Sequence, residues 1–218
     1  MNELIDLSHT VEHGMITYKG LPAPVISDHL SREASRSFYE SGTEFNIGKI
    51  EMVANTGTYL DSPFHRYPDG NDLSALDLAV LANLDALVLR HNGGRSIDAE
   101  NFAGLDVKGK AVLVHTAWDQ HWRTDHYSSG EHPFLTENAA NHLVNEGAVL
   151  VGIDSFNIDD TSAKSRPVHS TLLKNNVLIV EHLRGLDQLP DNNFKFFAVP
   201  VKVKSFGTFP VRAFALIP

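Results

Sequence analysis

The sequence predicts an α/β domain that is rich in short strands and has few helices. Short apolar runs recur along the chain, and those at 84–89, 111–115 and 177–180 are typical of buried strands. Helix signals are fewer, and they do not alternate with the strands as regularly as in a repeated βαβ chain. No internal repeat, low-complexity segment or linker interrupts the 218 residues. We therefore expect one domain over residues 1–218.

The first quarter of the chain predicts a strand, a long loop and a second strand. Residues 4–8 form the opening strand, and the glycines and prolines of residues 14–24 indicate an extended loop. Residues 31–43 are polar and rich in serine, which predicts a mobile excursion carrying two aromatic side chains. A strand then follows over residues 45–53.

Strands and capped helices follow in the rest of the chain. Residues 73–81 show a short helical pattern, and Asp98 is a candidate N-cap shortly after. Thr136 caps an amphipathic helix that ends near Gly147, and Pro167 suits the first turn of another. The expected strands lie at 84–89, 111–115, 148–153, 177–180, 194–203 and 211–217.

The composition excludes several classes of protein and site. A net charge of −9 argues against nucleic acid or an anionic membrane surface as the main partner. The absence of cysteine excludes disulfides, thiolate metal sites and a cysteine nucleophile. No basic segment leads into an apolar run at the start, and no run approaches about 18 apolar residues. We expect a cytoplasmic protein.

Residues 52–65 hold the densest group of chemically capable side chains. A predicted strand stops at Thr56-Gly57-Thr58, which requires tight backbone geometry. Pro63 has a fixed φ and biases the backbone of the preceding Ser62 away from helix, so we expect a stiff and mostly extended loop. Polar groups on a rigid loop after a buried strand commonly form a site. The candidates are Asn55, Tyr59, Asp61 and His65.

This stretch resembles the His-x-Gly-Thr-His-x-Asp-x-Pro-x-His signature of the cyclase family, which includes bacterial kynurenine formamidases and isatin hydrolase. The matching positions are Gly57, Thr58, Asp61, Pro63 and His65. Asn55 and Tyr59 stand where the family has its two leading histidines. The resemblance extends over nearly the whole chain and implies a single-domain swivelling β/β/α fold with a mixed, β-rich core.

The resemblance also implies a metal site. The family often binds two divalent ions, and the equivalent ligands to one of them here are Asp61, His169 and Glu181. The other ion would lose its two histidine ligands, which are Asn55 and Tyr59 here. A neutral Asn oxygen is a weak ligand and a phenol ligates well only when ionised, so we expect this second ion site to bind poorly. One imidazole with two carboxylates favours Mn²⁺ or Mg²⁺ and also accepts Zn²⁺. We expect one ion, with no ion at all as the alternative.

Other roles follow from the same resemblance. His65 would act as acid and base, which its ordinary pKa of about 6.5 suits. Asn55 and Tyr59 would be hydrogen-bond donors to a developing oxyanion, or would fill the position of the lost ion with their dipoles. Tyr18 is a candidate pocket wall, and Trp118 or Trp122 could hold a flat aromatic substrate, one of them from a neighbouring subunit.

Each candidate has an ordinary structural explanation. Asp61 before Ser62-Pro63 would accept backbone N–H groups in an Asx turn. His169 would be a helix residue, and Glu181 would pair with a cation such as Arg184. Taken together in the family's order, however, these residues favour a site over three unrelated structural roles.

The sequence therefore predicts a metal-dependent hydrolase of a small amide, with N-formylkynurenine or a related aryl amide or lactam as substrate. The first alternative is a metal-independent lyase or hydrolase that uses Tyr59, Asp61 and His65. The second alternative is a small-molecule binding protein without catalysis. The resemblance further implies a homo-oligomer, a dimer or larger.

Overall fold

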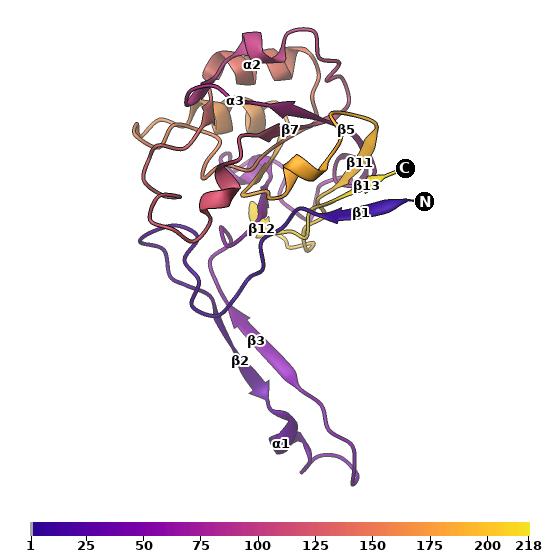
Figure 1. Ribbon diagram of the computed structural model, residues 1–218. Coiled ribbons are helices and arrows are strands. Elements are labelled where there is room, and N and C mark those ends of the chain that lie inside the picture. Colours follow the sequence, from indigo (N-terminus) through magenta and orange to yellow (C-terminus); the bar gives the residue numbers. More distant parts are fainter. Residues whose placement is uncertain (1) are drawn as a thin grey trace.

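The computed structural model describes residues 2–218, and its main feature is a nine-stranded mixed sheet (Figure 1). The strands lie in the order β1-β13-β11-β5-β7-β9-β10-β4-β12. In chain order they are β1 (Glu3–Asp6), β4 (Tyr59–Asp61), β5 (Leu84–Arg90), β7 (Ala111–His115), β9 (Leu150–Ile153), β10 (Leu178–Glu181), β11 (Phe194–Phe197), β12 (Thr208–Pro210) and β13 (Phe214–Ile217). Two smaller sheets pair β2 (Val25–Leu30) with β3 (Ile47–Glu51), and β6 (Ser96–Ile97) with β8 (Phe134–Leu135).

Helices are few and short, as the sequence predicts. The α-helices are α1 (Arg32–Ser35), α2 (Glu137–Asn145) and α3 (Pro167–Lys174). Single 3₁₀ turns occur at η1 (Pro63–His65), η2 (Leu78–Val80), η3 (Ala99–Phe102), η4 (Trp118–His121) and η5 (Leu186–Gln188). The expected caps are present: Thr136 accepts a hydrogen bond from Ala139 N, and Asp98 forms a capping box. Within residues 2–218, every helix is too short or too polar to span a bilayer.

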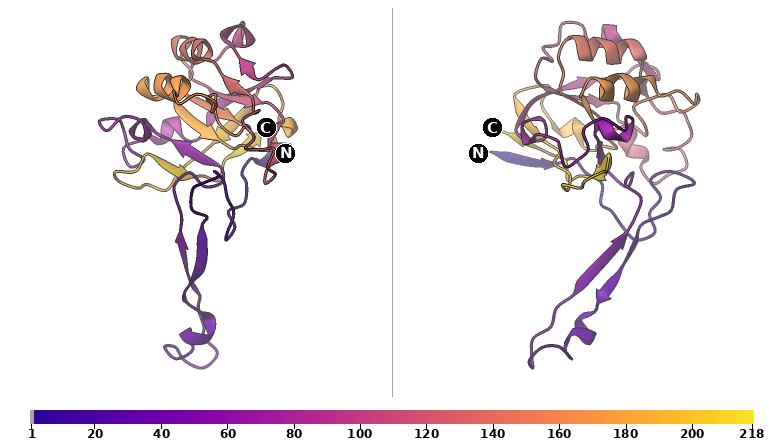
Figure 2. Two further views of the ribbon diagram at one scale, coloured as in Figure 1. Left: turned by 90° about the vertical axis from the view of Figure 1, so that its left-hand side faces the viewer. Right: turned by 180° about the vertical axis from the view of Figure 1, so that it is seen from behind.

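The centre of the sheet is parallel and covered on both faces. Strands β5, β7, β9 and β10 are parallel neighbours, and β7 and β9 are buried almost throughout. Helices α2 and α3 cover one face, where Leu143 and Leu172 pack in one cluster with Val151 (Figures 1 and 2). The other face buries Leu113 and Phe196 in a second cluster, which the antiparallel flanking strands help to enclose. The predicted α/β fold with few helices and a β-rich mixed core is confirmed.

The signature segment differs from the stiff extended loop that we expected. Tyr59-Leu60-Asp61 forms β4 inside the main sheet, paired antiparallel to β10 on one side and to β12 on the other. Pro63 then opens the turn η1, where its missing N–H costs nothing. The loop prediction was wrong because β12 lies far along the chain, in a stretch with no strand signal. The last strands are also shorter than expected: β11 ends at Phe197 and β13 begins at Phe214.

Two glycines allow close contacts around this segment. Gly57 has φ +66°, a conformation that residues with a side chain rarely adopt. A Cβ on Gly207 would lie only 2.3 Å from the backbone N of His65. The chain that leads into β12 therefore passes directly against η1, and only glycine fits there.

Residues 25–51 form an arm that projects from the domain (Figures 1 and 2). Strands β2 and β3 pair with each other, and α1 lies near the tip. The polar excursion expected at residues 31–43 is the tip of this arm. Because β2 and β3 belong to no other sheet, most of their side chains are exposed.

Candidate active site

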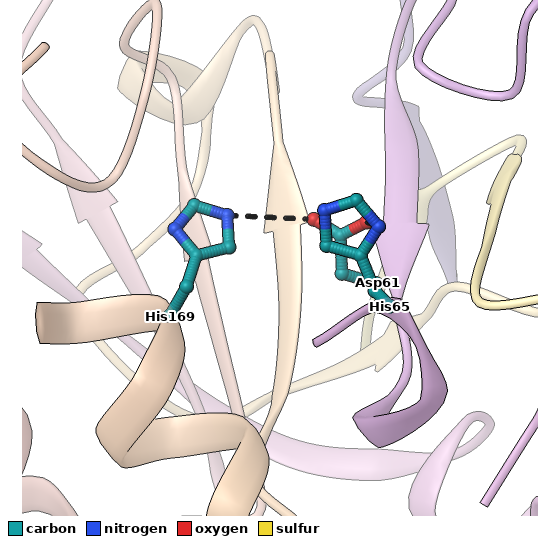
Figure 3. A group of neighbouring side chains, drawn as sticks. All are labelled: Asp61, His65 and His169. Carbon is teal, nitrogen blue, oxygen red and sulfur yellow. Dashed lines mark ion pairs between the residues drawn. The ribbon is translucent and has the colours of Figure 1, made fainter. Parts of the chain in front are cut away.

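Three side chains with metal-ligating atoms meet beside β4. Asp61 lies at the end of β4, His65 in η1, and His169 in the first turns of α3. One ligating atom of each lies within 4.8 Å of the others (Figure 3). His169 Nε2 is 3.7 Å from Asp61 Oδ2, an oxygen that is buried without a hydrogen-bond partner among the described residues. An unpartnered buried carboxylate oxygen is costly unless a cation faces it.

Asp159 holds the imidazole of His169 in this orientation. Its carboxylate accepts hydrogen bonds from His169 Nδ1 at 2.6 Å, from Val168 N at 2.8 Å and from His169 N at 3.0 Å. The side chain thus caps the start of α3 and fixes the imidazole ring. With Nδ1 donating to Asp159, Nε2 is directed at Asp61. Carboxylates commonly orient metal-bound histidines by this kind of hydrogen bond.

Glu181 lies next to this group, at the end of β10 opposite Tyr59. Its Oε1 is 3.7 Å from His169 Nε2 and accepts a hydrogen bond from Ile158 N at 2.7 Å. Its Oε2 accepts from Tyr59 Oη at 2.5 Å and from Tyr18 Oη at 3.2 Å. The alternative pairing of Glu181 with Arg184 is absent from the ion pairs of residues 2–218.

The charges around His169 call for a cation. Burial by itself lowers the pKa of His169, but Glu181, Asp159 and Asp61 outweigh it and raise this pKa to about 10. Burial raises the pKa of Glu181. A cluster of buried carboxylates around one imidazole requires either a proton on that imidazole or a metal ion between them. Together with the unpartnered Asp61 Oδ2, this donor set fits a divalent cation.

Thr208 links His65 to Asp61. Its hydroxyl donates to Asp61 Oδ1 and lies 2.7 Å from His65 Nδ1. A threonine hydroxyl has a single proton, and a carboxylate can only accept, so Thr208 accepts from His65 Nδ1–H. In its neutral form, His65 therefore has an unprotonated Nε2, on a side chain that is 35% exposed. That nitrogen is available as a base or as a ligand.

Tyr59 and Tyr18 form a buried hydrogen-bond network behind the group. Their hydroxyls are 2.8 Å apart, and Asn157 Nδ2 donates to Tyr18 Oη at 3.1 Å. Burial and the nearby charge of Glu181 raise the pKa of both tyrosines well above the ordinary value, so both remain neutral phenols. The only proton of Tyr59 is committed to Glu181. Tyr59 is therefore poorly suited to ligate a metal as a phenolate.

A pocket of about 270 Å³ opens onto these residues. Asn55 lies on its wall, and no side-chain hydrogen bond of the described residues uses the Asn55 amide. The lining residues are Tyr18, Leu21, Asn55, Tyr59, His65, Arg66, Asn157, Arg166, His169 and Glu181. A larger hollow of about 620 Å³ lies beside β5, but its charged side chains pair with each other, as in Arg90–Asp191 and Lys110–Asp106. The smaller pocket is the better candidate because it contains the unpaired groups.

Trp118 is not part of this pocket. Its indole is buried, packs with Tyr127 and Phe156, and donates to the carbonyl of Tyr127 at 3.0 Å. Trp122 stacks on His9 and is also absent from the lining. The expected contact of Trp118 with a substrate in its own chain is therefore wrong, because a buried core position satisfies both its ring and its N–H.

Sequence reasoning missed Asp159, Thr208, Arg66 and Arg166. Asp159 follows the strand end at 154–157, where a polar residue signals a site. Arg66 and Arg166 lie close in sequence to His65 and His169, which were already candidates. Thr208 had no such signal, since only the pairing of β12 with β4 places it opposite Asp61.

The sequence of this chain is similar to a known protein family and to characterised relatives. The sequence profile of a family described as putative cyclase matches residues 5–160. A kynurenine formamidase from Bacillus cereus is 28% identical over 216 residues, which cover 97% of this chain and 96% of the relative. One from Bacillus anthracis is 27% identical over 213 residues, covering 96% and 95%.

Solved structures show the same fold. A potential metal-dependent hydrolase with cyclase activity superposes with a TM-score of 0.81 at 24% identity, covering 100% of this chain and 99% of the other. Isatin hydrolase A from Labrenzia aggregata, bound to benzyl benzoate, gives a TM-score of 0.83 at 19% identity, covering 99% and 94%. The chain thus belongs to the cyclase family.

Proposed function

We propose that this protein is a metal-dependent hydrolase of a small aryl amide, with N-formylkynurenine or a related aryl formamide or lactam as substrate. The observation that carries this proposal is the unpartnered Asp61 Oδ2, which lies 3.7 Å from Nε2 of His169, a residue that lines a small pocket. The similarity to kynurenine formamidases supports the choice of substrate.

Asp61, His169 and Glu181 are the proposed ligands of one divalent ion, Mn²⁺, Zn²⁺ or Mg²⁺. Glu181 Oε1 and Asp61 Oδ2 each lie 3.7 Å from His169 Nε2. Such spacings suit atoms that share one ion at metal–ligand distances of about 2.0–2.2 Å. When bound, the ion would act as a Lewis acid and make a water molecule more acidic. His65 is the remaining member of the geometric group, with one ring nitrogen within 4.8 Å of ligating atoms of Asp61 and His169.

His65 is the proposed acid and base. With Nδ1–H donating to Thr208, Nε2 would take a proton from the attacking water and return it to the leaving nitrogen. Asn55 is the proposed donor to the developing oxyanion, because its amide is uncommitted and lines the pocket. Tyr59 has its proton on Glu181, which supports the alternative in which its dipole fills the position of a lost ion.

Metal content and turnover test this proposal together. The protein would be purified without chelator or nickel affinity steps, and its metals measured by elemental analysis beside an Asp61→Ala/His169→Ala double variant. We expect about one Mn, Zn or Mg per chain, lost in the variant, and hydrolysis of aryl formamides that chelation abolishes. Folded wild-type protein that lacks metal and still hydrolyses the amides would establish the metal-independent reaction instead. Ligand binding without turnover would favour the binding protein.

We also propose that a second copy of this chain covers the arm, giving a homo-oligomer. An isolated two-stranded hairpin is marginally stable in water. Seven large apolar side chains of the arm are between 39% and 72% exposed: Val25, Ile26, Phe38, Tyr39, Phe45, Ile47 and Ile50. At about 150–250 Å² for a whole aromatic side chain, Phe38, Tyr39 and Phe45 by themselves leave on the order of 300 Å² uncovered. A stable interface buries about 800 Å² on each partner, and these side chains would form the apolar centre of a symmetric contact between two arms.

A further inference from the structure

Two arginines line the pocket without a carboxylate to neutralise them. Arg66 follows η1 and Arg166 precedes α3, so the two residues flank His65 and His169 in sequence. Neither belongs to an ion pair of residues 2–218. The arginines that do pair with a carboxylate are Arg36, Arg90, Arg95, Arg123 and Arg212.

Neutral groups hold Arg66 in place. Its Nε donates to Ser170 Oγ at 3.3 Å, and its guanidinium carbon lies 5.2 Å from the centre of the Tyr67 ring. These contacts orient the side chain and leave its charge uncompensated. Its two terminal nitrogens make no hydrogen bond within the described part of the chain, so their N–H groups are available to a ligand.

Backbone carbonyls hold Arg166 in the same way. Its Nη1 donates to Ala163 O at 2.6 Å, to Ser165 O at 2.8 Å and, at 3.4 Å, to Asp160 O. Its Nε and Nη2 have no partner among residues 2–218. One nitrogen thus anchors the guanidinium to the loop before α3, and the edge formed by the other two remains free.

The ligand chemistry follows from these donors. A guanidinium edge binds a planar carboxylate through two parallel hydrogen bonds. The rest of the wall includes Tyr18 and Leu21, which suit a flat apolar body, and about 270 Å³ accommodates one small ring with its substituents. Glu181, the carboxylate in the lining, is held by Tyr59, Tyr18 and the Ile158 N–H and, in the described part of the chain, forms no ion pair with either arginine, so both guanidinium groups remain available to a ligand.

We infer that the substrate of this pocket is an anion whose carboxylate is bound by Arg66 and Arg166, while its amide lies against Asp61, His65 and His169. The identity of the bond that is cleaved rests on the proposed function above. The recognition of the carboxylate does not, because it depends only on the two arginines and on the pocket that they line.

Binding tests the inference without requiring turnover. Benzoate and its neutral isostere benzamide would be titrated into the full-length protein by calorimetry, before and after treatment with chelator. We expect benzoate to bind at least tenfold more tightly, a preference that Arg66→Gln and Arg166→Gln each reduce about tenfold. Arg32→Gln is the matched control, since it removes the same charge from the distant arm. Arg66→Lys and Arg166→Lys keep the charge and remove the planar fork, and we expect intermediate losses.

The outcomes separate this inference from the proposed function. Equal binding of benzoate and benzamide would overturn the inference, even if the protein hydrolyses neutral formanilide. The inference would also be overturned if chelation abolished the preference for benzoate while Arg66→Gln and Arg166→Gln left it unchanged. A bound metal ion would then be the partner of the anion. A preference lost in the arginine variants, in a protein that hydrolyses no formamide, would support the inference and refute the proposed function. With an active protein, the ratio of kcat/KM for formamidobenzoates to that for formanilide should fall in both Gln variants.

Discussion

The hydroxyl of Thr208 bridges Asp61 and His65, donating to Asp61 Oδ1 and accepting from His65 Nδ1 at 2.7 Å. The bridge exists because β12 pairs with β4 in a register that places Thr208 opposite Asp61. Because the single hydroxyl proton is donated to Asp61, His65 must supply its own proton on Nδ1 to the second hydrogen bond, so Thr208 is a positioning residue for the proposed acid and base.

Thr208→Val should therefore impair catalysis more than binding. Without the bridge, His65 can rotate and change tautomer, so we expect kcat to fall about 10- to 100-fold with little change in KM. Thr208→Ser should restore most of the rate, because it retains the hydroxyl. The ¹⁵N shifts of the His65 ring, assigned by difference with His65→Gln, should report Nδ1–H in the wild type and a mixture in Thr208→Val. The same tautomer in both proteins would refute this role.

Asp159→Asn should weaken metal binding without removing a proposed ligand. The carboxylate orients His169 through three hydrogen bonds, and removing a group that orients a metal ligand in this way typically lowers metal affinity about 10- to 100-fold. We expect a loss in that range in a competition titration with a fluorescent chelator. Asp160→Asn is a suitable control, since Asp160 is adjacent in sequence and pairs instead with Arg95. Equal losses in both variants would contradict the positioning role of Asp159.

Gly207→Ala should destabilise the protein because its Cβ would collide with backbone atoms. The new atom would lie 2.3 Å from His65 N, and overpacking of this kind costs about 1–3 kcal/mol. The free energy of unfolding, measured in urea, should fall by that amount, and activity should fall further because His65 moves. Gly94→Ala is the control, since its Cβ would meet nothing within 4 Å. Similar stabilities for the two variants would show that η1 is less closely packed than described.

His9 should contribute a loss of stability as the pH falls below about 6.5. Burial, together with Arg184 and Arg123, lowers the pKa of His9 to about 3, whereas the unfolded chain titrates near 6.5. Below pH 6.5 the unfolded state therefore binds more protons, and stability rises with pH through this range. Since His9 is only partly buried, we expect a loss of about 1 kcal/mol between pH 7.5 and 5.5 from this group. His9→Phe keeps the stack on Trp122 and should reduce the dependence by that amount in urea titrations at the two pH values. An unchanged dependence would show that His9 titrates normally.

Charged substitutions on the arm should dissociate the proposed oligomer. Phe38 is 72% exposed in the single chain, and Ile50 lies on β3 with its side chain exposed. Phe38→Asp and Ile50→Lys would place charges in the contact between copies, so analytical ultracentrifugation should show a smaller species than the wild type. Leu78→Asp is the control, because Leu78 is equally apolar and 64% exposed but lies outside the arm. A wild type that sediments as a monomer would refute the oligomer.

Local signals in the sequence determined helices α2 and α3, the central strands and the identity of most candidate residues. They did not predict α1, which lies in the expected polar excursion, and only residues 78–80 of the helical pattern at 73–81 form a helical turn. Thr136 and Asp98 cap their helices, and Pro167 opens α3, because caps and first turns depend on neighbouring residues alone. The buried runs at 111–115 and 178–181 became central strands because apolar segments of that length require cover on both faces.

The tertiary structure alone decided which polar groups meet. Asp61 lies next to His169 and Thr208 only because β4 is inserted between β10 and β12, a pairing between residues far apart in the chain. The same packing committed Tyr59 to Glu181, buried Trp118 away from the pocket and left Arg66 and Arg166 without a carboxylate. Sequence patterns report local geometry and burial, whereas the partner of a buried polar group depends on long-range register, which no local pattern encodes.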